Sequence, residues 1–178
     1  KGIEVQSVSL NLEKMMKNKE KAVSTLTKGV EFLLKKNKVQ FIKGSAILKS
    51  ATEISIKDSE NKEKIIKTEK IVICTGSEPT SLPKVDFDEQ KILSSTGALS
   101  LKSVPKKMAI IGGGYIGLEM GSVWSRLGSE VQVIEFMDHI TPGMDREISK
   151  EFLKILIKQG IKFHLESKVE NIKKELKL

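Results

Sequence analysis

The sequence predicts an α/β fold in which a parallel sheet follows an antiparallel β-meander. Two observations support this prediction. After Pro105, apolar strand-like runs alternate with helix-like segments, an order that is typical of a parallel sheet. Before that point, short alternating runs are separated by polar turns, as expected for antiparallel strands.

Composition limits the class of protein. The chain has 178 residues, 39% of them hydrophobic and 30% charged, which fits one or two soluble globular domains. The net charge is +8, but the lysines are spread among glutamates and the only arginines are Arg126 and Arg146. With aromatics at 4% as well, we expect no nucleic-acid partner. No apolar run approaches the roughly 20 residues of a membrane span, so we expect no membrane segment either. Because Lys1 is an implausible start, we expect the chain to be an internal piece of a longer protein.

The first half begins with a long predicted helix. Asn11 is a suitable N-cap, and apolar residues then recur at helical spacing over residues 12–36. Short runs at 39–42, 46–48, 54–56 and 65–66 predict strands of the meander. The β-branched run at 71–73 predicts a further strand, buried on both faces, that ends at Thr75-Gly76-Ser77. We expect Cys74, the single cysteine, to be a small buried apolar residue.

The second half starts with a connection. Residues 77–107 hold all but one of the prolines and predict an irregular passage with a short helix near residues 95–99. Strands are then predicted at 108–111, 131–134 and 161–165, with a helix over 115–127 that ends at Gly128 and another helix before the last strand.

A glycine motif joins the first strand of this half to its helix. Gly112, Gly114 and Gly117 form a G-x-G-x-x-G pattern in the strand–turn–helix context of a Rossmann-like dinucleotide site. Gly112 allows a sharp turn, Gly114 allows close approach of a pyrophosphate, and Gly117 and Gly121 allow the helix to pack against the sheet. The helix N-terminus would attract the phosphates.

An acidic residue ends the next strand, at the expected distance from the glycines. The Glu135 carboxylate can accept hydrogen bonds from the adenosine ribose and would repel a 2′-phosphate. No arginine follows it until Arg146. The sequence therefore favours NAD over NADP.

Two residues after the glycines have open roles. Tyr115 is in the first helical turn, where its ring either covers a cofactor pocket or packs in the ordinary way. Glu119 lies one turn later, where its carboxylate either pairs with a cation or carboxamide or is a solvated helix residue.

At this point the residues resemble a known family. Residues 112–128, followed by 131–135, closely resemble the NAD-binding segment of the dihydrolipoamide dehydrogenases, which are FAD-dependent pyridine nucleotide–disulfide oxidoreductases. Residues 71–79 are similar to the second flavin motif of that family, which usually has alanine where Cys74 stands. Residues 94–101 and 104–105 resemble its interdomain passage.

The resemblance implies two domains and two cofactors. Residues 1–94 would be the C-terminal part of an FAD-binding domain, and residues 95–178 an incomplete NAD-binding domain. It implies contacts with FAD at Ala46, Thr75, Gly76 and Ser77. It implies contacts with NAD(H) at Gly112, Gly113, Gly114, Tyr115, Ile116, Gly117, Leu118, Glu119 and Glu135, with Val169 on the adenine side. Tyr115 would gate the nicotinamide face of the flavin, although the family more often has an aliphatic residue there.

The resemblance also implies the activity of the whole protein. That protein would oxidise dihydrolipoamide with FAD and NAD⁺, serve the lipoyl domains of 2-oxoacid dehydrogenase complexes, and form a homodimer in a bacterial cytoplasm or a mitochondrial matrix. The family's C-x-x-x-x-C disulfide is absent here, and neither His139 nor His164 matches its His–Glu pair. We therefore expect no catalytic or metal-binding residue and no lipoamide turnover by this chain alone. The alternatives are an NAD(H)-binding module without catalysis, a remnant that binds neither cofactor, and another flavin disulfide reductase.

Overall fold

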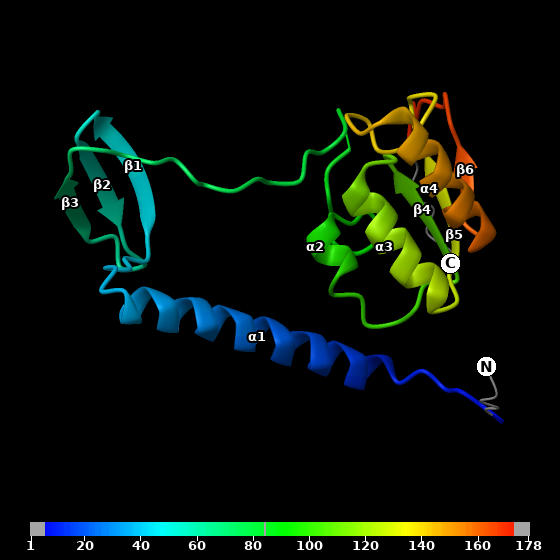
Figure 1. Ribbon diagram of the computed structural model, residues 1–178, viewed down its shortest axis with the longest axis horizontal. Coiled ribbons are helices and arrows are strands. Elements are labelled where there is room, and N and C mark those ends of the chain that lie inside the picture. The colour runs from blue at the N-terminus through cyan, green and yellow to red at the C-terminus, as the bar shows by residue number, and fades with distance from the viewer. Residues whose placement is uncertain (1–5, 84, 173–178) are drawn as a thin grey trace. The chain divides into compact units, whose positions relative to one another are not determined.

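A computed structural model describes residues 6–83 and 85–172 (Figure 1). The chain divides into two compact units, one formed by Lys1–Lys17 with Pro79–Leu178 and the other by Asn18–Glu78. The boundary expected between residues 94 and 95 falls inside the first unit. The predicted division into an FAD-binding domain and an NAD-binding domain at this boundary stays a prediction.

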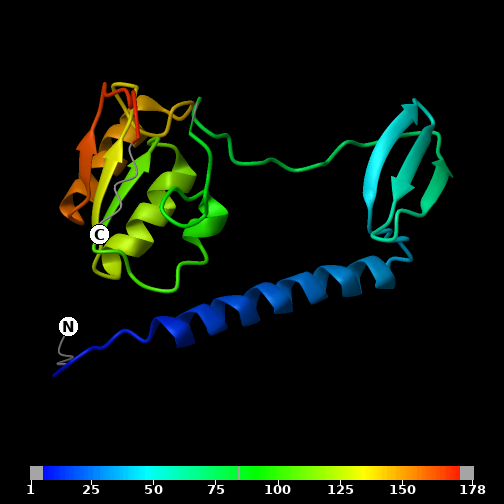
Figure 2. The ribbon, with the colours of Figure 1, turned by 180° about the vertical axis from the view of Figure 1, so that it is seen from behind.

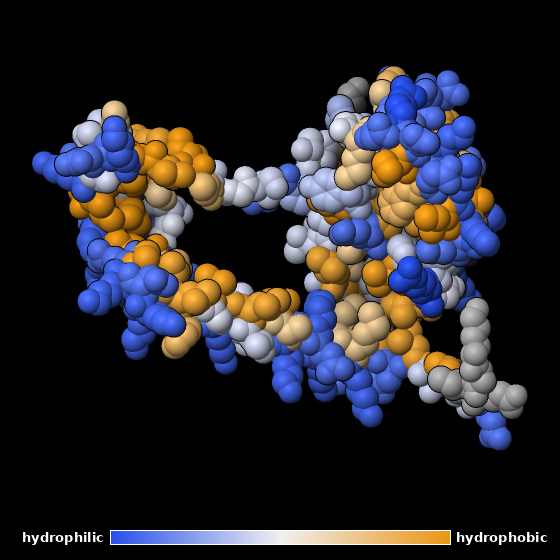
Figure 3. Space-filling view, viewed as in Figure 1, coloured by the Kyte–Doolittle hydropathy of each residue, from blue (hydrophilic) through white to orange (hydrophobic). Residues whose placement is uncertain are grey.

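Helix α1 (Leu12–Lys36) has the bounds that the sequence predicts. The Asn11 side-chain oxygen Oδ1 accepts a hydrogen bond from the main-chain N–H of Lys14 at 2.9 Å, which confirms the cap. Glu13 in the first turn and Lys35 and Lys36 in the last complement the helix dipole. The helix buries none of its side chains, and Figure 3 shows an apolar band along it.

The unit Asn18–Glu78 contains the predicted antiparallel meander. Strands β1 (Ser45–Ser50), β2 (Glu53–Lys57) and β3 (Glu63–Lys67) pair in that order. Ser55 in the central strand faces Ile47 on one side and Ile65 on the other. Its buried hydroxyl donates to Oε1 of Glu63 at 2.5 Å. The antiparallel part of the predicted fold is therefore confirmed.

Two predicted strands and one burial prediction are wrong in this unit. Residues 39–42 and 71–73 form no strand, and Val72 and Ile73 are 83% and 67% exposed. Cys74 is also exposed, not buried. The physical reason is that a β-branched run becomes a buried strand only when neighbouring strands bind its main chain. Among the described residues no strand pairs with this run.

The other unit contains the predicted parallel sheet. Its elements are α2 (Ser95–Ala98), β4 (Lys107–Ile111), α3 (Tyr115–Arg126), β5 (Glu130–Ile134), α4 (Arg146–Lys158) and β6 (Lys162–His164). The three strands run parallel in the order β4-β5-β6. Figures 1 and 2 show α3 and α4 on the same face of this sheet. The Rossmann-like α/β prediction is confirmed.

The buried core lies between these two helices and the sheet. Val131 and Val133 of β5 are fully buried, and Leu118 of α3 and Leu156 of α4 pack against them. Trp124, also on α3, is 2% exposed. At the C-terminus of α3, Gly128 has φ +106°, the left-handed conformation that the sequence predicts for it. Within the described part of the chain, no helix is both long and apolar enough to cross a membrane.

Candidate functional site

The candidate site is the glycine-rich turn between β4 and α3. Gly112 has φ +101°, a left-handed conformation that glycine adopts without strain. Its N–H donates to the carbonyl of Ile134 at 2.9 Å, so the turn begins where β4 and β5 end side by side. The carboxyl edge of a parallel sheet is where ligands bind in such folds.

Gly114 leaves space in front of helix α3. It is the N-cap, and a Cβ placed on it would meet nothing within 4 Å. No side chain caps the helix, and no acidic residue lies in its first turn. The first N–H groups of a helix have no acceptor within the helix, so this end offers hydrogen-bond donors and a partial positive charge to an anion.

Gly117 and Gly121 bring the helix close to the sheet. A Cβ on Gly117 would lie 2.8 Å from the carbonyl oxygen of Gly112 and 2.9 Å from a methyl of Ile110. A Cβ on Gly121 would lie 2.8 Å from Ile110. The three roles that the sequence predicts for these glycines, as turn, open cradle and packing surface, therefore match the geometry.

Glu135 reaches the glycine turn through Gly113. Its Oε2 accepts the Gly113 N–H at 2.5 Å and its Oε1 accepts the Met137 N–H at 2.7 Å. The side chain is buried, with 6% of the residue exposed. A carboxylate has about four acceptor positions, so two main-chain bonds leave capacity for a ligand hydroxyl.

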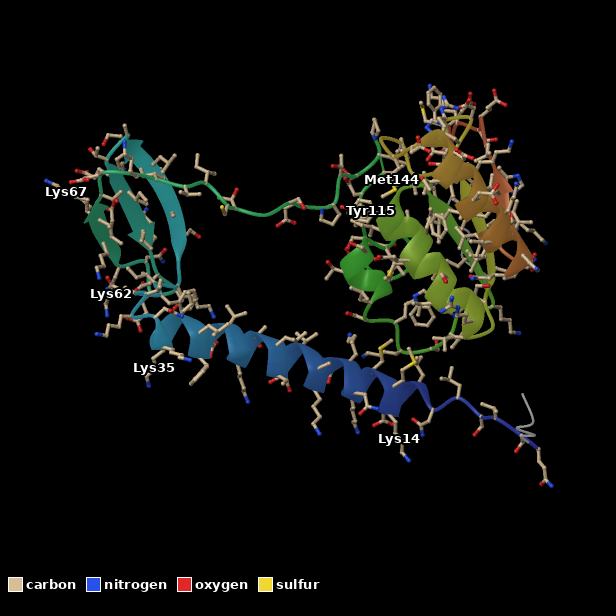
Figure 4. All side chains as sticks on the ribbon, in the orientation of Figure 1. Lys14, Lys35, Lys62, Lys67, Tyr115 and Met144 are labelled. Carbon is tan, nitrogen blue, oxygen red and sulfur yellow. The ribbon has the colours of Figure 1, made fainter. Side chains whose placement is uncertain are left out.

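The remaining predicted residues of this half differ in exposure. Tyr115 is 61% exposed, Ile116 is 48% exposed and Glu119 is exposed, whereas Leu118 is 1% exposed in the core. The Tyr115 ring is therefore free of the core, and Figure 4 shows it at the same end of the unit as Met144. The Leu118 side chain packs inside, which leaves only its main chain for a cofactor contact. For Glu119, a contact with a cation or carboxamide and a solvated helix position both stay predictions.

Val169 is half-buried in the segment that follows β6. Just before it, the Ser167 N–H donates to the Glu135 carbonyl and the Glu166 N–H donates to the Met137 carbonyl, both at 2.9 Å. The residues just before Val169 are therefore hydrogen-bonded to the main chain around Glu135, and the adenine contact of Val169 stays a prediction.

The predicted flavin residues lie in the other unit. Ala46 is exposed on β1, where it pairs with Ile56. Thr75, Gly76 and Ser77 lie in an exposed segment without regular structure, and Gly76 has φ +78°. These residues are exposed, and the contacts of the described residues do not form a shared pocket from them.

Three residues near the turn were not predicted from the sequence. The Thr141 N–H donates to the Gly113 carbonyl at 2.7 Å, and the Thr141 and Ser149 hydroxyl oxygens lie 2.7 Å apart. Ile140 packs beside Gly113. One signal in the sequence could have indicated Ser149. Asp145 is a suitable N-cap, and its side chain caps α4 and thereby fixes Ser149 in the first turns of that helix.

The two histidines take no part in the turn. His139 Nδ1 lies 2.6 Å from Oδ1 of Asp138, and Arg146 donates to Oδ2 of Asp138 at 2.7 Å. The Arg146 hydrogen bond first, and the His139 bond second, lower the pKa of Asp138 below its ordinary 3.8. His164 is exposed and lies 3.0 Å from Gln132. His139 is partly buried, with a side chain 16% exposed.

No metal site accompanies the turn. In residues 6–83 and 85–172, no group of three or more His, Cys, Asp or Glu side chains could hold a metal ion.

Residues 3–177 match the family described as pyridine nucleotide-disulphide oxidoreductase. The chain belongs to this family. It is 53% identical over 171 residues to the mitochondrial dihydrolipoyl dehydrogenase of Pisum sativum, and the match covers 96% of the chain and 34% of the relative. It is also 53% identical over 168 residues to dihydrolipoyl dehydrogenase 3 of Pseudomonas putida, covering 94% of the chain and 36% of the relative. The family resemblance read from residues 112–135 is confirmed.

Solved structures of the family give the same fold. The HOCl-induced flavoprotein disulfide reductase RclA of Escherichia coli is 31% identical with a TM-score of 0.71, covering 88% of this chain and 36% of that one. LpdA of Mycobacterium tuberculosis, at 18% identity and a TM-score of 0.78, covers 90% and 36% and shows the shared fold. The chain spans about a third of the length of the curated relatives that it matches.

Proposed function

We propose that this chain holds NAD(H) for a flavoenzyme resembling the dihydrolipoyl dehydrogenases. The observation that carries the proposal is the pairing of an open Gly114 with a Glu135 carboxylate at the same turn. A dinucleotide needs both, because its pyrophosphate takes main-chain N–H groups and its ribose takes a carboxylate.

The residues of the turn fit NAD. The N–H groups that begin α3 would bind the pyrophosphate in the space in front of Gly114. Glu135 would accept ribose hydroxyls and repel a 2′-phosphate, and Val169 would flank the adenine. Tyr115, exposed at the start of α3, would cover the nicotinamide end. Bound NAD⁺ supplies a hydride acceptor. The chain's own residues bind and orient it.

The flavin residues fit the second cofactor through their main chain. Thr75, Gly76 and Ser77 are exposed, and a Cβ on Gly76 would meet nothing within 4 Å, so a ligand can approach the backbone. Ala46, which is exposed on β1, would contribute its main chain beside the adenine of FAD.

The activity of the whole protein follows from its relatives. We propose that it oxidises dihydrolipoamide with FAD and NAD⁺, accepts the lipoyl domains of 2-oxoacid dehydrogenase complexes, and acts as a homodimer. Its relatives include mitochondrial and bacterial dihydrolipoyl dehydrogenases, and we propose the mitochondrial matrix or a bacterial cytoplasm for it. Because Cys74 is the only cysteine, this chain cannot form the reactive disulfide, and we expect no lipoamide turnover from it alone.

Two other functions have an observation in their favour. The single cysteine favours an NAD(H)-binding module without catalysis. The likeness to RclA, a flavoprotein disulfide reductase, favours a different disulfide substrate.

The experiment is a calorimetric titration of the 178-residue chain with NADH, NADPH and FAD. We expect NADH to bind at least roughly ten-fold tighter than NADPH, a difference of about 1.4 kcal/mol. Gly114→Ala should abolish NADH binding and change the melting temperature little, because its methyl enters only the ligand space. Gly29→Ala, on exposed α1 with nothing within 4 Å, is the matched control and should bind NADH normally. NADH binding that survives Gly114→Ala would contradict the proposal. FAD binding would count against the binding-only module.

A further inference from the structure

We propose that Thr141, held by Ser149, is a positioning residue that aims the main-chain N–H of Gly114 at the dinucleotide. This inference rests on the proposed NAD(H) function and adds two residues to its site.

Gly113 is held from both sides. Its N–H donates to Glu135, and its carbonyl accepts the Thr141 N–H at 2.7 Å. It also fits a narrow slot, since a Cβ there would lie 3.2 Å from both Glu135 Oε2 and a methyl of Ile140. Ile140 is fully buried in the core, so the slot has a fixed wall.

The peptide plane carries this restraint to the ligand side. The carbonyl of Gly113 and the N–H of Gly114 belong to one planar trans peptide and point in opposite directions. When Thr141 fixes the carbonyl, it also fixes the direction of that N–H. Gly114 is the N-cap of α3, with open space around its Cβ position, so the N–H belongs to the end of the helix that would receive the pyrophosphate.

Thr141 needs outside support to stay in this position. It has φ +50°, a left-handed conformation that is rare for a β-branched residue, and it is only 4% exposed. Its hydroxyl donates to the Ile140 carbonyl at 2.8 Å, so the Ser149 hydroxyl is the donor in their 2.7 Å contact.

Ser149 is itself fixed by helix α4. It is 1% exposed, and its N–H donates to the carbonyl of Asp145 at 2.9 Å. The Asp145 side chain caps the helix by accepting from Glu147 and Ile148. The position of α4 is therefore transmitted through Ser149 and Thr141 to the glycine turn.

The test compares NADH affinity and melting temperature for Ser149→Ala and Thr141→Val. Each removes one hydroxyl of the pair and keeps the Thr141 N–H. We expect each to weaken NADH binding roughly five-fold, the size of effect that loss of one hydrogen bond gives. Thr141→Ser keeps the hydroxyl and should bind NADH nearly as well as the unmodified chain.

Ser129→Ala is the matched control. The Ser129 hydroxyl is also buried and donates to the Pro105 carbonyl at 2.6 Å, but it lies just before β5, at the opposite end of that strand from Glu135. This control should lower the melting temperature by a similar amount and leave NADH affinity unchanged. The amide resonance of Gly114 should shift in Ser149→Ala and Thr141→Val and stay in place in Ser129→Ala.

The outcomes separate the two proposals. If the unmodified chain binds NADH and all three alanine or valine variants bind it alike, the positioning role is overturned while the proposed function stands. An unmoved Gly114 resonance in Ser149→Ala and Thr141→Val overturns the positioning role whether or not NADH binds. If the unmodified chain fails to bind NADH, the proposed function falls, and the positioning role falls with it.

Discussion

The main-chain N–H of Gly113 donates to the carboxylate of Glu135 over 2.5 Å, although 22 positions separate the two residues. The bond joins the turn after β4 to the end of β5. It gives Glu135 a structural role in the free chain besides its proposed contact with the ribose.

Glu135→Gln should destabilise the parallel-sheet unit. The carboxylate accepts N–H bonds from Gly113 and Met137, and an amide has only one oxygen to offer. One buried N–H would lose its partner, at a cost of about 1–3 kcal/mol. Denaturant unfolding without cofactor measures this. Glu119→Gln, an exposed change on α3, is the control and should stay within about 0.5 kcal/mol of the unmodified chain. Equal stability of the two variants would contradict the structural role.

Gly117→Ala should destabilise the same unit for a different reason. Its methyl would lie 2.8 Å from the Gly112 carbonyl oxygen, a main-chain atom that cannot move aside cheaply. Overpacking of this kind costs about 1–3 kcal/mol. Gly114→Ala, whose methyl meets nothing, should cost less, at most about 1 kcal/mol, which is roughly the difference between glycine and alanine at an N-cap. Thermal unfolding of the two variants distinguishes a glycine that packs against the sheet from one that leaves space for a ligand. A larger loss of stability in Gly114→Ala than in Gly117→Ala would refute this distinction.

The hydrogen bonds of Asp138, including its ion pair with Arg146, should contribute stability that depends on pH. Arg146 and His139 lower the pKa of Asp138, so the folded chain holds its carboxylate more strongly than the unfolded chain does. The contribution is therefore complete above the ordinary value of 3.8 and is lost as pH falls through the lowered folded pKa. Asp138→Asn should lower the melting temperature at neutral pH. The effect should be small, because the Asp138–Arg146 pair is exposed. The two melting curves should converge in acid. Curves that stay parallel down to the acid limit would rule this contribution out.

Hydrogen exchange should differ between the two sheets. In the described part of the chain, the buried apolar residues all lie in the parallel-sheet unit, and Ser55 is the buried residue of the meander. Local opening is cheapest where few apolar contacts are lost. Amides of β4, β5 and β6 should be protected more than roughly ten-fold longer than those of β1, β2 and β3, as measured by mass spectrometry. Equal protection would contradict this.

Local signals explain why much of the fold could be predicted. The bounds of α1 depend on Asn11 and on apolar spacing, both of which lie within the helix region itself. The turn at Gly112, the cradle at Gly114 and the packing at Gly117 each depend on the missing Cβ, which the sequence displays directly. The geometry at each of these glycines was therefore predictable from the sequence.

The errors have a common physical origin in contacts between distant residues. The run at 71–73 has strand propensity, but a strand also needs partners, and propensity does not show whether they are present. Thr141 carried no visible signal, because its positive φ opposes its intrinsic preference and is imposed by Gly113 and Ser149. Residues that are fixed by tertiary contact are missed by reasoning along the chain.

Trp124, buried on α3, is the only tryptophan of the chain. Its indole fluorescence is therefore an intrinsic optical probe of the unit that contains the glycine turn. Far-ultraviolet circular dichroism reports on all the helices together, because α1 has 25 residues while α3 has 12 and α4 has 13. Fluorescence thus follows one unit and circular dichroism follows the helices of both, and neither needs a label.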